Sequence, residues 1–422
     1  MSLRSINSYL NKHCPFYIKI KEFIRKNKYL LYRPYVSLRY HQIKKKEQIK
    51  VLFVVSEAST WKTKSLYDEM MVHPRFFVQL GISTTIENPE SKSVLVGYLE
   101  KNNYQYIDLD SNPNYIDSQK FDFVFYYKPY DASFSKGVSY SFHKHVIPCG
   151  VNYCYVIQND YCAFYRPIYD YCWKYFAQNE IEAKVRKQIL GIRANNTIVT
   201  GFPMQDELNR PKEEFTNPWK DRDGRKKIIY APHHSIKGTN GGGIEFATFL
   251  IYGKFMQQLA EKYKDKIYIA FKPHPNLYKK LLKIWGQEET DAYYAAWENG
   301  ENSQIEKGDY VSLFKHSDAM IHDSASFIIE YHFTGNPVMF LYADTLNLDV
   351  FNEFAKEAFD KQYIAKTKED IENFILNVIN GVDPMKEQRR EFYEKNLLPP
   401  HGNTASTNII KAILGEPPYD NC

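Results

Sequence analysis

The chain has 422 residues, which is too long for one small domain and predicts two or three domains. Its 44% hydrophobic and 25% charged residues are typical of a soluble globular protein. No apolar run approaches the length of a membrane span, and the charged N-terminus has no apolar core of a signal peptide. The 6 cysteines have no zinc-like spacing and fit a reducing cytosol. These features favour a cytoplasmic protein.

The positive charge is concentrated at the N-terminus. Residues 1–50 hold 13 Lys or Arg against Glu22 and Glu47, a local charge of +11, so the rest of the chain carries −6 of the net +5. Apolar and aromatic residues alternate with these cations between Phe16 and Arg33. The pattern favours an amphipathic helix on an anionic membrane. A solvated helix packed on the body remains open. Nucleic acid is not expected as a partner, because no recognised binding module accompanies the charge.

Strands and helices alternate through the first half of the chain. Short buried strands are predicted over residues 50–56, 76–82, 104–109, 121–127 and 197–200, with helices over 65–73, 94–101 and 180–190. This alternation predicts a doubly wound α/β domain over residues 49–212, behind a basic segment of residues 1–48. The polar stretch Glu213–Arg225, which contains Pro218 and Gly224, predicts the linker to a second domain.

The second half repeats the α/β pattern. Strands are predicted over residues 227–231, 266–271, 319–321 and 338–342, with helices over 246–263, 324–333, 371–379, 384–395 and 404–414. We therefore expect a second parallel-sheet domain over residues 213–385, followed by C-terminal helices over 386–422.

Polar side chains follow three of the predicted strands in this second half. They lie in Ala231–Ser235 (APHHS), Lys272–Pro275 (KPHP) and Asp323–Ser326 (DSAS). Ligands of open parallel sheets bind beyond the carboxyl ends of the strands. Lysine, histidines, hydroxyls and a helix N-terminus together suit a diphosphate. Each segment alone has a structural explanation, since Ser and Asp often cap helices; the three together predict a nucleotide site.

No metal or cofactor is expected. The pairs Asp108/Asp110 and Asp221/Asp223 lie in polar, loop-like surroundings, where such spacing arises by chance. His233 and His234 are adjacent, and adjacent side chains point apart in a strand, which predicts a poor chelate.

The second half resembles the CDP-glycerol glycerophosphotransferases, which build teichoic-acid-like and capsular poly(alditol phosphate) chains. The matching segments are Ile229–Pro232, Lys272–Pro275, Asp309–Leu313, Ser317–Ile321, Asp323–Ser326 and Pro337–Asp344, with Gly201–Pro203, Asp206 and Leu208 before them. The resemblance covers about residues 197–344. It implies the GT-B fold, in which two Rossmann-like domains face each other across a cleft. The donor nucleotide would lie mainly on the second domain, and the acceptor would face the first.

The resemblance also assigns roles to residues of the donor site. His274 matches a family histidine at the donor diphosphate. Asp323, Ser324 and Ser326 match the turn that holds the donor phosphates. We expect Lys272 and His234 to stabilise these phosphates as well.

The chain departs from the family at the proposed catalytic base. The family's Trp-His-Gly segment, which carries that histidine, has no counterpart in this sequence. The nearest stretch is His143–Gly150, so His143 or His145 becomes the candidate base. Where the family often has Thr-Trp-Arg after Ala-Pro, this chain has His233–Ser235.

The predicted function is therefore a transferase. It would move glycerol phosphate, or a related alditol phosphate, from CDP-glycerol or another nucleotide-activated donor to a lipid-linked or polysaccharide acceptor, with release of CMP. It would work on the inner face of a bacterial cell membrane. Two alternatives stay open. One is a GT-B glycosyltransferase that uses a nucleotide sugar in capsule or O-antigen synthesis, and the other is a non-catalytic, membrane-associated protein with a degenerate fold.

Overall fold

The structure is a computed structural model of the whole chain. It describes residues 32–84, 91–112, 114–130, 134–135, 137–139, 143, 145–159, 167–221, 224–236, 245–307, 310–325 and 327–420. Ser326 and the predicted amphipathic segment before residue 32 lie outside these ranges.

A parallel five-stranded sheet forms the first lobe, in the order β3-β2-β1-β4-β5. Its strands are β1 (Ile49–Val55), β2 (Phe76–Ile82), β3 (Ile107–Asp108), β4 (Phe123–Tyr126) and β5 (Ile147–Cys149). A bridge between Gly150 and Tyr175 joins it to the parallel pair β6 (Tyr175–Ala177) and β7 (Thr197–Val199). The predicted strand over residues 104–109 is only two residues long, and β5 was not predicted.

Helices flank this first sheet. They are α3 (Lys64–Val72), α4 (Ser91–Lys101), α5 (Tyr115–Gln119), α7 (Pro167–Tyr171), α8 (Glu180–Leu190) and α9 (Met204–Asn209), preceded by a helix over residues 32–43. Asn179 begins α8, because its side chain accepts a hydrogen bond from the backbone N–H of Glu182. Residues 32–43 pack on the lobe through Val36, Tyr40 and Ile43, all buried.

A second parallel sheet has the order β10-β9-β8-β11-β12-β13. Its strands are β8 (Lys226–Ala231), β9 (Ile267–Phe271), β10 (Ser303–Ile305), β11 (Ala319–His322), β12 (Val338–Leu341) and β13 (Tyr363–Ala365). Both of its faces are covered: Ile229 and Ala231 join one hydrophobic cluster, whereas Ile228 and Tyr230 join another. The strand order reverses direction between β1 and β4 in the first sheet and between β8 and β11 in the second, which marks the topological switch points.

The helices of the second half are α10 (Phe249–Lys262), α11 (Leu277–Ile284), α12 (Gly286–Asn299), α13 (Val311–Lys315), α14 (Phe327–Glu330), α15 (Glu353–Phe359), α16 (Lys368–Asn380), α17 (Lys386–Asn396) and α18 (Ala405–Leu414). The single helix predicted over residues 324–333 is wrong in form. Only α14 is α-helical there, and a 3-10 turn, Tyr331–Thr334, follows it. Among the described residues, no helix is long and apolar enough to span a bilayer.

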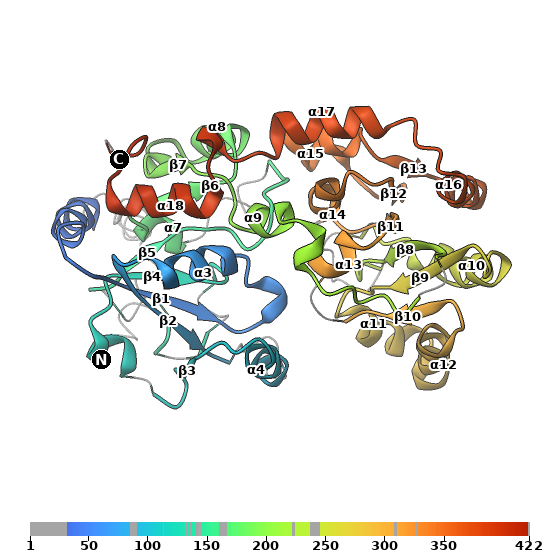
Figure 1. Cartoon of the computed structure of the whole chain (residues 1–422), viewed down its shortest axis with the longest axis horizontal. Helices are drawn as coiled ribbons and strands as arrows, with labels where there is room; N and C mark the ends of the chain where they lie inside the picture. The colour runs from blue at the N-terminus through green and yellow to red at the C-terminus, as the bar shows by residue number, and fades with distance from the viewer. Residues whose placement is uncertain are drawn as a thin grey trace, which may run out of the picture.

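The chain crosses back to the first lobe at its end (Figure 1). The red helix α18 lies over that lobe beside α3, while α17 stays with the second lobe. The Asp206 carboxylate accepts hydrogen bonds of 2.8 Å from the backbone N–H groups of Ala405 and Ser406, at the first turn of α18. The Thr407 hydroxyl donates to Glu69 of α3 at 2.6 Å.

The carboxyl edge of the first sheet faces the second lobe. Lys62, a few residues beyond the end of β1, reaches across and lies with its Nζ 4.5 Å from the ring centre of Tyr310. The same Nζ is 3.9 Å from the Glu330 carboxylate. Because the strands are parallel, the residues that precede β4 and β5 lie at the opposite edge, away from this contact.

Candidate functional site

Three histidines meet at the carboxyl ends of β8 and β9. The rings of His233 and His234 stack with their centres 4.4 Å apart, and the His274 ring lies edge-on at 4.9 Å and 4.0 Å from them. The backbone N–H of His274 donates to the carbonyl of Pro232 at 3.0 Å, which ties the two loops together. The expectation that His233 and His234 point apart is wrong, because both lie beyond the end of β8, where the alternation of a strand no longer applies.

Asp323 holds this cluster in place from the neighbouring strand. Its carboxylate accepts from the backbone N–H of His233 at 2.6 Å and from the N–H and hydroxyl of Thr248 at 2.7 Å and 2.9 Å. The side chain is fully buried, and burial raises its pKa to about 6. Asp323 follows β11, so this contact spans the switch point of the second sheet. The geometry fits a residue that positions the histidine loop, since both carboxylate oxygens are occupied.

The protons of two imidazoles are fixed by backbone groups. The N–H of Ser235 donates to Nδ1 of His233 at 3.2 Å, and the N–H of Asn276 donates to Nδ1 of His274 at 3.1 Å. A neutral imidazole that accepts at Nδ1 carries its proton on Nε2. Both rings therefore present an Nε2–H donor to any ligand at the cluster.

The cluster is electrically neutral in the free protein. Burial lowers the pKa of His233 to about 3, with a further lowering from His234 beside it. Burial, then the two neighbouring histidines and Lys272, lowers the pKa of His274 to about 2. Burial also lowers the pKa of His234. These shifts reflect buried imidazoles crowded without an anion, and a bound phosphate would favour their protonation.

The three rings are also close enough to raise the question of a metal, since one nitrogen of each lies within 4.8 Å of the others. A metal-bound imidazole normally donates a hydrogen bond from the nitrogen that faces away from the ion. In His233 and His274, Nδ1 accepts a hydrogen bond from a backbone N–H, so an ion bound at Nε2 would leave no proton on Nδ1 to donate. The arrangement of donors therefore fits an anion better than a cation.

Lys272 and Ser324 complete the site. The Nζ of Lys272 lies 5.6 Å from the ring centre of Tyr310, so this lysine extends toward the interface between the lobes. The N–H of Ser324, a residue of the turn expected to hold the donor phosphates, donates to Nδ1 of His322 at 3.1 Å. With α14 only four residues long, the helix end contributes little. The Ser324 hydroxyl, which makes no hydrogen bond to any described residue, is the group that remains for a ligand.

His143 and His145 lie far from this cluster in the fold. They precede β5, at the amino edge of the first sheet, whereas Lys62 and the second lobe meet the carboxyl edge. His143 is buried, with Nδ1 2.9 Å from Asp117 and Nε2 2.6 Å from the carbonyl of Gly137. Both of its ring nitrogens are thus engaged in local structure. This placement argues against either histidine as the base for an acceptor bound between the lobes.

Sequence reasoning overlooked two members of the site. His233 lies in the predicted segment Ala231–Ser235 but was not named among the donor-site residues, yet its ring is part of the cluster. Thr248, which anchors Asp323, lies at the start of α10 and has no motif around it. His233 could have been found from its place in the segment Ala231–Ser235. The role of Thr248 could not, because it depends on a contact with Asp323, 75 residues further along the chain.

Comparison with known proteins supports a donor site on the second sheet. The family model of CDP-glycerol:poly(glycerophosphate) glycerophosphotransferases matches residues 160–415, more than half of the chain and all of the second sheet. His143 and His145 precede the matched segment. No curated protein matches the chain.

Solved structures share the fold at low identity. The wall teichoic acid polymerase TagF is 15% identical, with a TM-score of 0.58, and the alignment covers 98% of this chain and 97% of that one. A TagF variant soaked with CDPG is 14% identical, with a TM-score of 0.57, and the alignment covers 98% of each chain. A putative UDP-N-acetylglucosamine 2-epimerase from Listeria monocytogenes is 16% identical, with a TM-score of 0.56 and a coverage of 87% of this chain and 96% of that one.

The comparisons confirm the predicted GT-B architecture and the family resemblance. The parallel sheets and their switch points agree with that fold. This protein belongs to the CDP-glycerol:poly(glycerophosphate) glycerophosphotransferase family and is a transferase of that kind.

Proposed function

We propose that the chain transfers glycerol phosphate, or a related alditol phosphate, from a CDP-linked donor to a lipid-linked or polysaccharide acceptor of the teichoic-acid type, with release of CMP. The observation that carries the donor assignment is the cluster of His233, His234 and His274 at the switch point of the second sheet. Two of its rings present fixed Nε2–H donors, which are suited to the oxygens of a diphosphate.

The chemistry requires little beyond positioning and charge stabilisation. An acceptor hydroxyl attacks the distal phosphorus and gives its proton to a base on the first lobe, the bond to the bridging oxygen breaks, and the negative charge moves onto CMP. In this proposal the imidazole donors and Lys272 stabilise that charge, and the Ser324 hydroxyl holds a phosphate oxygen. Asp323 keeps the histidine loop in position without touching the donor.

The acceptor side is assigned to the first lobe. Glu57 follows β1 and Lys128 follows β4, so both lie at the carboxyl edge and flank the switch point of the first sheet. Their side chains form an ion pair of 3.0 Å and are largely buried. We assign residues 49–212 to the acceptor domain and residues 213–385 to the donor domain. In this arrangement Glu57 and Lys128 border the acceptor and take the place that sequence reasoning gave to His143 and His145.

Membrane association is the other part of the proposal, and it rests on the charge of residues 1–46. The packing of Val36, Tyr40 and Ile43 ties residues 32–43 to the first lobe, so a truncation should stop at residue 31. Removing residues 1–31 is expected to release the protein from vesicles that contain an anionic lipid while leaving donor binding intact. Unchanged vesicle binding would refute the peripheral assignment.

The donor assignment is tested by product analysis. Incubation with CDP-glycerol and an acceptor should release CMP, and the variant His274→Gln should lose at least about tenfold in donor affinity, because a charge-assisted hydrogen bond is removed. His41→Gln, an exposed histidine on the helix over residues 32–43, is the matched control and should behave as wild type. Release of a nucleoside diphosphate from a nucleotide sugar would establish the glycosyltransferase alternative instead.

A further inference from the structure

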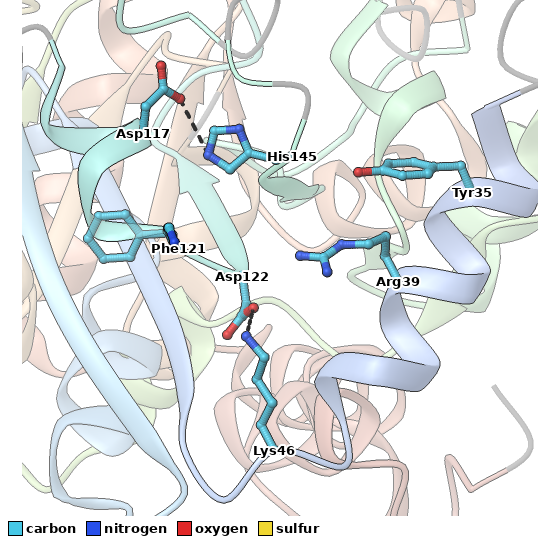
Figure 2. Close-up of a pocket in the computed structure, with 8 residues that line it drawn as sticks. Tyr35, Arg39, Lys46, Asp117, Phe121, Asp122 and His145 are labelled. Atoms are coloured by element: carbon cyan, nitrogen blue, oxygen red, sulfur yellow. Dashed lines mark hydrogen bonds and ion pairs between the residues drawn. The ribbon is translucent and has the colours of Figure 1, made fainter.

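A cavity lined by both charged and aromatic side chains lies at the opposite edge of the first sheet from the donor site. It has a volume of about 580 Å³ and is bordered by the helix over residues 32–43, the turn before β1, the corner between α5 and β4, and His145. Asp122 immediately precedes β4 and His145 precedes β5, so the cavity opens at the amino ends of the strands. Figure 2 shows Tyr35 and Arg39 extending from the helix toward Asp122 and His145.

The acidic groups of this cavity are already paired. Asp122, almost fully buried, binds Nζ of Lys46 at 2.5 Å and the backbone N–H of Lys50 at 3.1 Å. Asp117 interacts with Nδ1 of His143 at 2.9 Å. Both carboxylates therefore already have partners at the cavity, and Asp117 also lies 3.4 Å from Nε2 of His145.

Two of its remaining cationic side chains, Arg39 and Lys120, have no acidic partner among the described residues. Arg39 donates from Nη1 to the side-chain oxygen of Gln42 at 3.3 Å, and its Nε is buried without a hydrogen bond. Lys120 lines the cavity and forms no ion pair within the described ranges. His145 Nε2 is 3.4 Å from Asp117 and is likewise buried without a hydrogen bond of normal geometry. Two orphaned polar atoms and two uncompensated positive charges thus border one space.

We propose that this cavity binds the phosphodiester of a glycerol phosphate. A guanidinium group forms paired hydrogen bonds with two phosphate oxygens, which would satisfy the buried Nε of Arg39. Lys120 and His145 supply further donors, and the half-exposed Tyr35 ring gives an apolar wall for the glycerol carbons. The volume is within the range of small-molecule sites and holds one phosphate with its glycerol groups.

The same chemistry occurs in two sources: the headgroup of phosphatidylglycerol and a soluble glycerol phosphodiester. In the sequence, the helix that carries Arg39 directly follows the basic segment before residue 32. The site is distinct from the donor cluster and does not depend on the proposed transfer reaction.

The test combines two substitutions that keep the local backbone. Lys120 has a left-handed φ of 53°, which asparagine tolerates, so Lys120→Asn removes the charge without adding strain. Arg39→Gln keeps a helix-forming side chain and removes the guanidinium. The control is Lys45→Gln, an exposed residue of the neighbouring turn that does not line the cavity. Thermal unfolding and CDP-glycerol binding, measured on all three proteins, verify that the fold and the donor site are intact.

Two binding measurements follow, one with soluble glycerophosphoglycerol and one with phosphatidylcholine vesicles with and without phosphatidylglycerol. Loss of at least about tenfold in affinity for glycerophosphoglycerol in the double variant, with Lys45→Gln unchanged, supports the site and a soluble source. If the double variant loses affinity only for vesicles that contain phosphatidylglycerol, with Lys45→Gln unchanged, the result supports the site and a lipid source. If the double variant binds both probes as the control does, or if wild type binds neither, the proposal is overturned.

Discussion

The backbone N–H of His233 donates a 2.6 Å hydrogen bond to the buried carboxylate of Asp323, 90 residues further along the chain. The second oxygen of the same carboxylate binds Thr248 at the start of α10. One side chain therefore positions the loop after β8 and the beginning of α10 around the histidine cluster.

This relationship predicts the effect of Asp323→Asn. Asparagine offers a single acceptor oxygen, and its amide nitrogen would face either the N–H of His233 or that of Thr248, so a buried donor loses its partner. We expect a loss of about 1–3 kcal/mol in the free energy of unfolding, together with weaker donor binding. Urea unfolding and nucleotide titration measure the two effects. Asp349→Asn, at a side chain that is 94% exposed, is the control and should leave both unchanged.

The buried histidines make stability depend on pH. Burial lowers the pKa of five of them: that of His234, and those of His233 to about 3, His274 to about 2, His322 to about 4 and His332 to about 3. Histidine in an unfolded chain titrates near pH 6.5. Between these values the unfolded chain binds protons that the folded protein does not. Their contribution to stability is therefore complete above about pH 6.5 and is lost as the pH falls.

Three buried carboxyl groups, including Glu182, have a raised pKa and oppose this trend. Burial raises the pKa of Asp206 and of Asp323 to about 6, so the folded protein takes up these protons first, and their contribution is lost as pH rises through about 6. The five histidines outnumber the three acids, and we expect net destabilisation from about pH 6 to pH 4. Replacing His332 by Gln should flatten this slope by about 1.4 kcal/mol per pH unit, as measured by urea unfolding across the range. An unchanged slope would contradict the assignment of His332 as buried and neutral.

Contact between the lobes depends on Lys62. Its Nζ donates to the hydroxyl of Tyr310, which in turn donates to Glu330, and all three side chains are buried. Lys62→Gln leaves the Glu330 carboxylate without its cation, and we expect a loss of about 3–5 kcal/mol in stability. The double variant Lys62→Gln/Glu330→Gln should be less destabilised than the two single losses added together. Additive losses in the unfolding free energy would show that the two residues are not coupled.

Gly201 is expected to tolerate no side chain. It has a φ of +87°, and a Cβ there would lie 2.9 Å from Pro399 and 3.0 Å from Ala405, both from the returning C-terminal segment. Gly201→Ala should therefore combine backbone strain with a steric clash and lower the melting temperature markedly.

Gly224→Ala is the matched control for this substitution. Gly224 has a similar φ of +78°, but a Cβ there meets nothing within 4 Å. Its substitution should cost only the strain of the left-handed backbone, about 1–2 kcal/mol. Equal losses of thermal stability for the two variants would show that packing of the C-terminal segment against Gly201 contributes nothing.

Much of the fold could be predicted because its signals are local. Runs of buried residues such as those of β1 and β8 predict parallel strands, and polar residues at the ends of β8, β9 and β11 predict a ligand site at the carboxyl edge of the second sheet. Some shorter elements were not predicted from the sequence. β10 and β13, three residues each, have too few residues for a pattern to emerge, and the helix after Ser324 changes to a 3-10 turn after four residues.

The sequence by itself determined the two α/β halves, the family and the segment in which the donor residues lie, since hydrophobic periodicity and short motifs depend only on neighbours along the chain. The tertiary structure alone decided which way the side chains of those segments turn. The packing of His274 against His233 and His234 and the burial of Asp323 under the His233 loop follow from contacts between segments far apart in the chain. It also placed His143 and His145 at the amino edge of the first sheet, because the edge at which a loop emerges depends on strand direction and order.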